Sequence, residues 1–165
     1  MLRETRVHPE RILLWVFVGL AFIQCERGIL YEEVQEVKRA EWAVEEPQVF
    51  EWEITDSTKI YDIFITLQHN GDYPYRNLFL FAETESPAEL SHRDTLAAFL
   101  ADPSGKWTGK GSGALISHRF PLMLNKRFSG NGELRIIVHH GMRDPELEGI
   151  ERLGILIKEH IEDNE

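Results

Sequence analysis

The sequence predicts an all-β protein, a single antiparallel β-sandwich of the jelly-roll type with about eight strands. Three observations lead to this prediction. Apolar and polar residues alternate with a period of two in several short segments, as expected for half-buried strands. Clusters of Gly, Pro, Asn and Asp separate these segments at short intervals. Little of the chain shows a helical period.

The composition is that of an ordinary globular protein with one domain. The chain has 165 residues, of which 42% are hydrophobic and 28% are charged. The formal net charge of −10 argues against nucleic-acid binding, which depends mainly on contacts of Lys and Arg with phosphate. It also argues against binding to anionic lipid through a basic patch.

Residues 1–24 are predicted to be a signal peptide that precedes the fold. Three arginines among the first eleven residues form a basic start. Residues 12–23 are an uninterrupted apolar run, which is too short for a membrane span of ~20 residues. Cys25, the only cysteine, lies just past this run. We interpret this start as that of a bacterial lipoprotein, with cleavage before Cys25 and acylation of this residue, although Gln24 stands where a small residue is usual.

Two other interpretations of this start stay open, an uncleaved anchor and a soluble secreted protein. Cleavage after residue 24 would remove three Arg and two Glu, so that the net charge becomes −11. Residues 25–28 would then be a lipidated cysteine with a very short tether, and anionic headgroups would repel the acidic body. The sandwich domain is expected at residues 29–159 and a polar tail at residues 160–165.

The predicted strands follow one another along the sandwich domain. Residues 29–37 are a possible first or edge strand, and the charged stretch up to Pro47, which contains Trp42, is predicted to be a loop. Residues 95–101 fit either a helix or a strand. The alternation predicts further strands at residues 49–54, 61–67, 77–84 (a central strand), 114–120, 133–140 and 153–157.

Inward-facing positions of these strands supply the predicted core. Their side chains are large and apolar, whereas their neighbours along each strand are mostly polar. The residues assigned to the core are Phe50, Trp52, Ile63, Ile65, Leu80, Ile136, Val138 and Ile155.

A glycine-rich loop at residues 102–113 lies between two apolar segments. Its Trp107 is unusual in a flexible connector, and it has two possible roles: a plug folded back onto the core, which we favour, or an anchor for a partner. Asp102 is expected to set the turn by accepting hydrogen bonds from nearby backbone N–H groups. Lys106 and Lys110 place positive charge on an acidic surface, which would orient a partner.

The sequence shows no motif for catalysis, a metal or a cofactor. The Gly-Lys pair at residues 109–110 lacks both the glycine and the hydroxyl residue of a phosphate-binding loop. His139 and His140 are neighbours in a predicted strand and point to opposite faces, and the other histidines have no metal-binding spacing. Ser112 lacks the Gly-x-Ser-x-Gly elbow of a hydrolase. We therefore predict a protein that is not an enzyme and that uses no metal or cofactor.

Four aromatic residues fall in predicted loops: Trp42, Tyr73, Tyr75 and Trp107. Such residues close the ends of a sandwich, which we favour here, or form a platform for a sugar ring or a partner protein. Aromatic rings buried at the sandwich ends would indicate closure. Rings side by side on one concave face would indicate a sugar-binding module.

Six stretches of the chain match the motifs of one known family. They are ITDSTK with Tyr61, NGDYPYRNLFL from residue 70, DTL from residue 94, ADPSGKWTGKG from residue 101, HGMR from residue 140 and LEGI from residue 147. On these residues the chain resembles the gliding-motility-associated lipoproteins of the GldH type, from the phylum Bacteroidota. The resemblance covers most of residues 54–157, includes the lipoprotein start and favours a strand at residues 95–101.

The resemblance implies a non-enzymatic scaffold or assembly protein of the cell envelope, held by lipid on Cys25 to the inner or outer membrane and facing the periplasm. Its implied partners are other gliding and protein-secretion proteins, although members of the family also occur in bacteria that do not glide. A sugar-binding β-sandwich module on a lipoprotein anchor is the alternative. The candidate surface for a partner or ligand comprises Tyr73, Tyr75, Asp102, Lys106, Trp107, Lys110 and Arg143.

Overall fold

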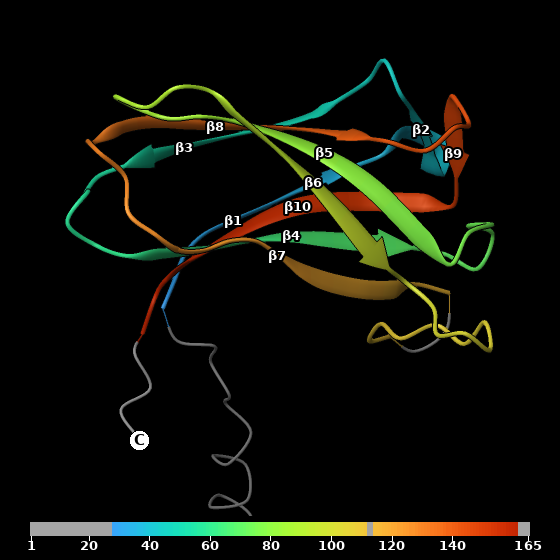
Figure 1. Ribbon diagram of the computed structural model, residues 1–165. Coiled ribbons are helices and arrows are strands. Elements are labelled where there is room, and N and C mark those ends of the chain that lie inside the picture. Colours follow the sequence, from blue (N-terminus) through green and yellow to red (C-terminus); the bar gives the residue numbers. More distant parts are fainter. Residues whose placement is uncertain (1–27, 112–113, 162–165) are drawn as a thin grey trace, which may run out of the picture.

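Figure 1 shows the computed structural model of the chain, which describes residues 28–111 and 114–161. The expected signal peptide, Cys25 and most of the polar tail lie outside these residues. Ten strands and one short 3-10 helix, η1 (Lys38–Ala40), form the described part. No helix in this part is both long and apolar enough to span a membrane.

Two antiparallel sheets of four strands pack face to face as a sandwich, as Figure 1 shows. Consecutive strands pass repeatedly from one sheet to the other, as in a jelly roll, so the predicted fold class is confirmed. The first sheet contains, in spatial order, β1 (Ile29–Glu36), β10 (Ile150–Glu159), β4 (Tyr61–His69) and β7 (Ile116–Lys126). The second contains β3 (Gln48–Ile54), β8 (Gly132–His140), β5 (Asn77–Glu85) and β6 (His92–Phe99).

A short ribbon of two strands, β2 (Glu41–Ala43) and β9 (Glu146–Glu148), corrects the loop predicted around Trp42. The Trp42 side chain is 1% exposed, and its Nε1–H donates to the carbonyl oxygen of Glu46 at 2.9 Å. Three residues are too few to display an alternation, and the partner strand lies about a hundred residues further along the chain. Local pattern therefore could not reveal this pair.

Strand β7 is longer than predicted, because it continues through Pro121 to Lys126. Proline is tolerated there since β7 is the edge strand of its sheet and needs no hydrogen bond on its outer side. The register between β4 and β7 shifts on both sides of Ile63. Such irregularities break the period of two on which the prediction relied.

The predicted core is confirmed at seven of its eight positions, where the side chains of Phe50, Ile63, Ile65, Leu80, Ile136, Val138 and Ile155 are at most 2% exposed. Trp52 is the exception, because it is only partly buried. It lies on the edge strand β3, with its ring centroid 6.4 Å from that of Tyr31 and 5.4 Å from that of Tyr61. The prediction placed Trp52 on the correct face of its strand, but it did not account for the position of β3 at the edge of the sheet, where a side chain is only partly covered.

The eight long strands run back and forth between two opposite ends of the sandwich, where their connections gather (Figure 1). We call the end where β1 begins the proximal end; there the N–H of Glu159 donates to the carbonyl oxygen of Gly28 at 2.9 Å. The proximal end also contains the connections at residues 55–60, 86–91 and 127–131. The distal end holds η1, the β2–β9 ribbon and the connections at residues 70–76, 100–115 and 141–145.

The structure predicts a large stability loss on truncation of Ile65, which is 0% exposed at the centre of the first sheet. Ile65→Ala should lower the free energy of unfolding by about 2–5 kcal/mol, because it leaves a cavity between the sheets. Leu90→Ala is the matched control, since Leu90 is 95% exposed and should change stability little. Denaturant unfolding followed by circular dichroism measures both, and equal effects would contradict this assignment of the core.

Candidate functional site at the distal end

The seven residues of the predicted surface all lie in distal connections, although they are spread over 71 positions of the sequence, from Tyr73 to Arg143. Aromatic contacts join two of these connections through the end of β4. The ring of His69 packs edge-on against Trp107, with centroids 4.5 Å apart, and lies 5.8 Å from that of Tyr73. Tyr73 in turn packs edge-on against Tyr75 at 5.8 Å. A chain of four rings therefore crosses the distal end.

Hydrogen bonds fix the two tyrosines among these four rings. Tyr73 is 2% exposed, and its hydroxyl donates to the carbonyl oxygen of Asn77 at 2.9 Å. The hydroxyl of Tyr75 donates to the carboxylate of Asp144, which ties the connection at residues 70–76 to the one at 141–145. Arg143, beside this contact, is exposed.

The loop after β6 has the turn expected from its sequence. The Oδ1 atom of Asp102 accepts hydrogen bonds from the hydroxyl and the N–H of Ser104, at 2.6 and 2.8 Å, and from the N–H of Lys106 at 3.1 Å. These hydrogen bonds lower the pKa of Asp102, because they stabilise its charged form. Gly105 adopts φ of +87°, a left-handed conformation that favours glycine. Trp107 then returns to pair with Ala101.

Trp107 is partly buried and packs against the core of the sandwich. The loop around it sits directly on β7, since a Cβ atom at Gly109 would lie 2.5 Å from Ile116 Cγ2 and 2.6 Å from His118 Nε2. Only glycine permits this approach. Trp107 therefore covers the distal end of the core, while Lys106 and Lys110 on either side of it are exposed.

A pair of buried histidines beneath this loop was not expected from the sequence, which places His69 and His118 on separate segments. Their Nε2 atoms lie 3.2 Å apart and their rings stack at 5.2 Å. Because His69 Nδ1 lies 2.7 Å from the carbonyl oxygen of Asn70, it carries the proton, and His118 donates from Nε2 to His69. The pairing of β4 with β7 sets His118 opposite Leu67, two residues from His69, and no local signal gives that register.

Both histidines are held in the neutral form. Burial lowers the pKa of His69, and burial together with the neighbouring His69 lowers the pKa of His118 to about 4. Protonation of both rings would set two N–H groups against each other under Trp107. The described residues contain no group of three or more His, Cys, Asp and Glu side chains that could hold a metal ion. The pair packs beneath Trp107, and a hydrogen bond joins its two rings.

Charge is unevenly distributed over the distal end. Arg76, Lys106, Lys110 and Arg143 are exposed and form no ion pair with any described residue. The β2–β9 ribbon on the same end is acidic and carries Glu41, Glu146 and Glu148. Arg76 was not among the residues predicted for this surface. Its carbonyl oxygen accepts hydrogen bonds from the N–H groups of Leu100 and Ala101, at 2.8 and 3.0 Å, which places it beside the loop that carries the two lysines.

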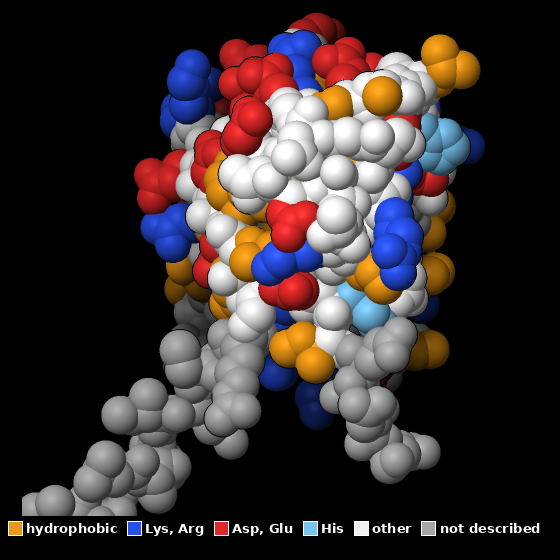
Figure 2. Space-filling model, turned by 90° about the vertical axis from the view of Figure 1, so that its left-hand side faces the viewer, with side chains coloured by type: hydrophobic (Ala, Val, Ile, Leu, Met, Phe, Trp, Pro, Cys, Tyr) orange, Lys and Arg blue, Asp and Glu red, His pale blue; other side chains and the backbone are white. Residues whose placement is uncertain are grey.

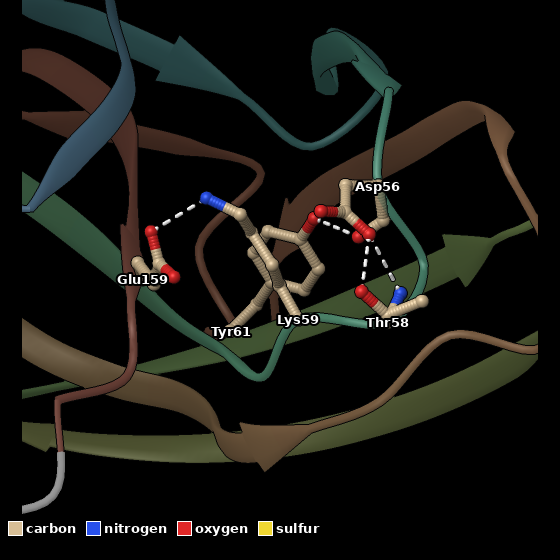
Figure 3. Close-up of polar contacts among 5 residues, drawn as sticks. All are labelled: Asp56, Thr58, Lys59, Tyr61 and Glu159. Atoms are coloured by element: carbon tan, nitrogen blue, oxygen red, sulfur yellow. Dashed lines mark hydrogen bonds and ion pairs between the residues drawn. The ribbon is translucent and has the colours of Figure 1, made fainter.

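The proximal end carries a second polar cluster, drawn in Figure 3. The hydroxyl of Tyr61 donates to the backbone carbonyl of Asp56, whose carboxylate accepts from the hydroxyl and N–H of Thr58 at 2.6 and 3.0 Å. Lys59 Nζ lies 2.7 Å from the carboxylate of Glu159. This cluster explains part of the ITDSTK motif structurally, because it locks the turn before β4 to the end of β10.

Figure 2 looks onto the proximal end. Acidic and basic side chains are interspersed there, and the hydrophobic side chains lie in small separate groups. The side chain of Asn131 crosses this end, accepting from the N–H of Ser57 at 2.7 Å and donating to the carbonyl oxygen of Thr55 at 3.0 Å. Polar side chains therefore tie the proximal turns together. Five exposed hydrophobic residues also lie at this end: Ile29, Leu30, Leu90, Leu124 and Ile161.

A family model described as GldH lipoprotein matches residues 29–157, which include every strand of both sheets except the last two residues of β10. The chain belongs to the GldH lipoprotein family. This confirms the resemblance seen in the sequence motifs.

Two relatives match over nearly their whole length. The chain is 31% identical over 154 residues to a gliding motility lipoprotein GldH homolog of Christiangramia forsetii, covering 89% of this chain and 94% of that protein. It is 28% identical over 159 residues to the gliding motility lipoprotein GldH of Flavobacterium johnsoniae, covering 93% and 98%.

Among solved structures, the chain is similar to the Eiger TNF protein of S. frugiperda with a TM-score of 0.40 and 10% identity, over 84% of this chain and 98% of that one. It is also similar to the carbohydrate-binding module TmCBM61, solved with β-1,4-galactotriose, with a TM-score of 0.33 and 8% identity, over 79% of this chain and 90% of that one. Neither likeness is close enough to bear on function.

We expect Trp107→Ala to lower the free energy of unfolding by about 2–3 kcal/mol, less than the ~3–5 kcal/mol for a fully buried aromatic. The reason is that the indole covers His69 but is only partly buried. Lys106→Ala, at the exposed neighbouring position, should leave stability unchanged. Denaturant unfolding compares the two variants. If Trp107→Ala instead leaves stability intact and weakens association with a partner, the side chain is an anchor and not a plug.

The histidine pair predicts a loss of stability in mild acid. Since both pKa values lie below that of free histidine, the unfolded chain takes up protons first as the pH falls below about 6.5. Each histidine then removes up to about 1.4 kcal/mol of stability per pH unit. For His118 this loss continues until its folded pKa of about 4 and is absent above neutral pH.

Unfolding free energies at pH 7.5 and pH 5 test this expectation. His118→Gln should flatten the difference between the two pH values, whereas His92→Gln should not, because His92 is exposed. An unchanged pH dependence in the His118 variant would contradict the role of the pair.

Proposed function

We propose that the protein is a lipid-anchored, non-enzymatic component of the gliding motility apparatus in the cell envelope, and that it presents its distal end to a partner protein. The names of its relatives from Christiangramia forsetii and Flavobacterium johnsoniae support the gliding and lipoprotein parts of this role. The scaffold part rests on the arrangement of the two ends of the sandwich.

The observation that carries the proposal is the opposition between the start of β1 and the candidate surface. Residue 25 precedes Gly28 by three positions, a reach of about 10 Å at most. Lipid on Cys25 would therefore keep the proximal end next to the membrane. The distal end, with Trp107, Tyr75 and the exposed cations, would face away from it at the full length of the strands.

The aromatic side chains support a scaffold over a sugar-binding module. Trp42 and Tyr73 are 1% and 2% exposed, and Trp107 and Tyr75 are partly buried against their neighbours. These four rings close the distal end of the sandwich, and among the described distal residues they form no row of open faces on which a sugar ring could stack. Exposed cations on the distal loops, among them Lys106, Lys110 and Arg143, would steer and orient an acidic protein partner.

Lipidation is tested by Cys25→Ala in the full-length chain expressed in its host. The variant should accumulate as unprocessed precursor, lose labelling with a fatty-acid analogue and fail to complement loss of the gene in surface spreading. Gln24→Ala is the matched control, because a small residue before the cysteine should preserve or improve processing. Persistent labelling of the Cys25 variant would reject the anchor, and full complementation by an unlabelled Cys25→Ala variant would reject the anchored scaffold.

A further inference from the structure

The two sheets have four edge strands, β1, β7, β3 and β6, and three of them carry the features that keep sheet edges from pairing with other chains. Strand β1 bears Glu32, Glu33 and Glu36 and has a register shift near its start. Strand β3 bears Glu51 and Glu53. Strand β7 contains Pro121 and two register shifts. Charge, proline and irregular register each discourage the addition of a further strand.

Strand β6 lacks these features over its second half, Thr95–Phe99, which reads TLAAF. It pairs with β5 in an unbroken register from His92 to Phe99, so the strand is regular. Within the described residues no strand pairs with its outer edge. An uncharged, regular and unpaired edge is an acceptor for an extended segment of another chain.

The outer face beside this edge is apolar and open. Phe99 is 65% exposed and Phe79, on the adjacent strand β5, is 41% exposed. Phe79 pairs with Ala97, two residues before Phe99, so the two phenyl rings are diagonal neighbours on the same face. Phe99 has Asn77 on one side, and no strand of the described residues pairs with it on the other. The free edge ends there, because the N–H of Thr108 donates to the carbonyl oxygen of Leu100 at 2.9 Å. A strand added at the edge would flank Phe99 and cover both rings.

The surroundings of this half-strand favour an acidic occupant. The loop that continues from Phe99 carries Lys106 and Lys110 and lies below the tip of β6 in Figure 1, and Arg76 contacts the chain at Leu100. All three cations are exposed and form no ion pair with a described residue. In a strand, alternate side chains point to opposite faces. An added strand could therefore set apolar side chains beside Phe79 and Phe99 and carboxylates towards the lysine loop.

We propose that the Thr95–Phe99 half of β6 accepts an extended acidic segment of another envelope protein, which adds to the second sheet as a fifth strand. The inference rests on the proposed scaffold role and supplies its contact. Backbone hydrogen bonds along the edge provide the attachment, and the phenyl rings and lysines select a segment that alternates apolar and acidic residues. A second copy of this chain is disfavoured as the occupant, because each copy has a net charge of −10 and brings the same cations to the contact.

A peptide probe tests the edge directly. The full-length chain in detergent micelles is mixed with a ten-residue peptide of alternating valine and glutamate, or with the same peptide carrying lysine for glutamate. Hydrogen exchange of the backbone amides in β6 should slow at least tenfold with the acidic peptide and not with the basic one. Equal protection by both peptides, protection of β1, β3 or β7 in its place, or none at all overturns the inference.

Two matched variants place the contact on β6. Ala97→Glu puts a negative charge on the exposed edge and should abolish the protection, while Val34→Glu puts the same charge on an exposed position of edge strand β1 and should preserve it. Circular dichroism and the unfolding midpoint establish that both variants are folded. Protection that survives Ala97→Glu in a folded protein overturns the inference, as does loss of protection in the folded Val34→Glu variant.

Cross-linking in the host identifies the occupant. A photoreactive residue in place of Ala97 should form an adduct with an acidic, extended segment of another protein, and the same residue in place of Val34 should not. An adduct between two copies of this chain, a basic segment, or no adduct overturns the inference. If Ala97→Glu leaves partner association intact while Cys25→Ala abolishes complementation, the edge is wrong and the scaffold role stands. If Cys25→Ala also complements fully, the proposed function itself fails.

Discussion

The burial of alternate side chains between two sheets is the constraint on which the rest of this structure depends. Ile63, Ile65 and Leu67 of β4 are each 0% exposed, and they can face Leu78 and Leu80 of β5 only if both sheets present their apolar faces inward. Because neighbouring strands in each sheet are antiparallel, their connections gather at two opposite ends of the sandwich. The position of each connection then follows from strand order alone, which is how distant residues come to share the distal end.

The two ends are closed by different interactions, and the difference bears on their roles. Hydrogen bonds and ion pairs of polar side chains, among them Asp56, Lys59 and Asn131, tie together the proximal turns. Packed rings, from Trp107 to Tyr75, close the distal end and leave cations exposed around them. Aromatic residues and exposed cations at the distal end suit recognition of a protein.

The fold could be predicted from the sequence where it depends on local patterns, and could not where it depends on pairing between distant segments. Alternation and turn residues were sufficient for the jelly roll and for seven of eight core positions, because a strand of seven or more residues displays its buried face in its own sequence. The β2–β9 ribbon, the second half of β7 and the contact of His69 with His118 depend on pairing between residues 49 to 107 positions apart. Nothing local to either partner encodes that pairing.

Part of the candidate site could be predicted from local composition, and part could not because it depends on position in the folded structure. Glycine, aromatic and lysine residues in the loop at residues 102–113 are visible as unusual composition, so Trp107 and its flanking lysines could be selected without coordinates. Arg76 and the free edge at Thr95–Phe99 could not be selected in this way. Among the described residues, Arg76 is distinguished by having no ion pair and the edge by having no paired strand, and neither property is visible in the sequence. An apolar strand such as TLAAF reads as core until its position in the sheet is known. Edge position alone turns the same five residues from a packing element into a surface that another chain can extend.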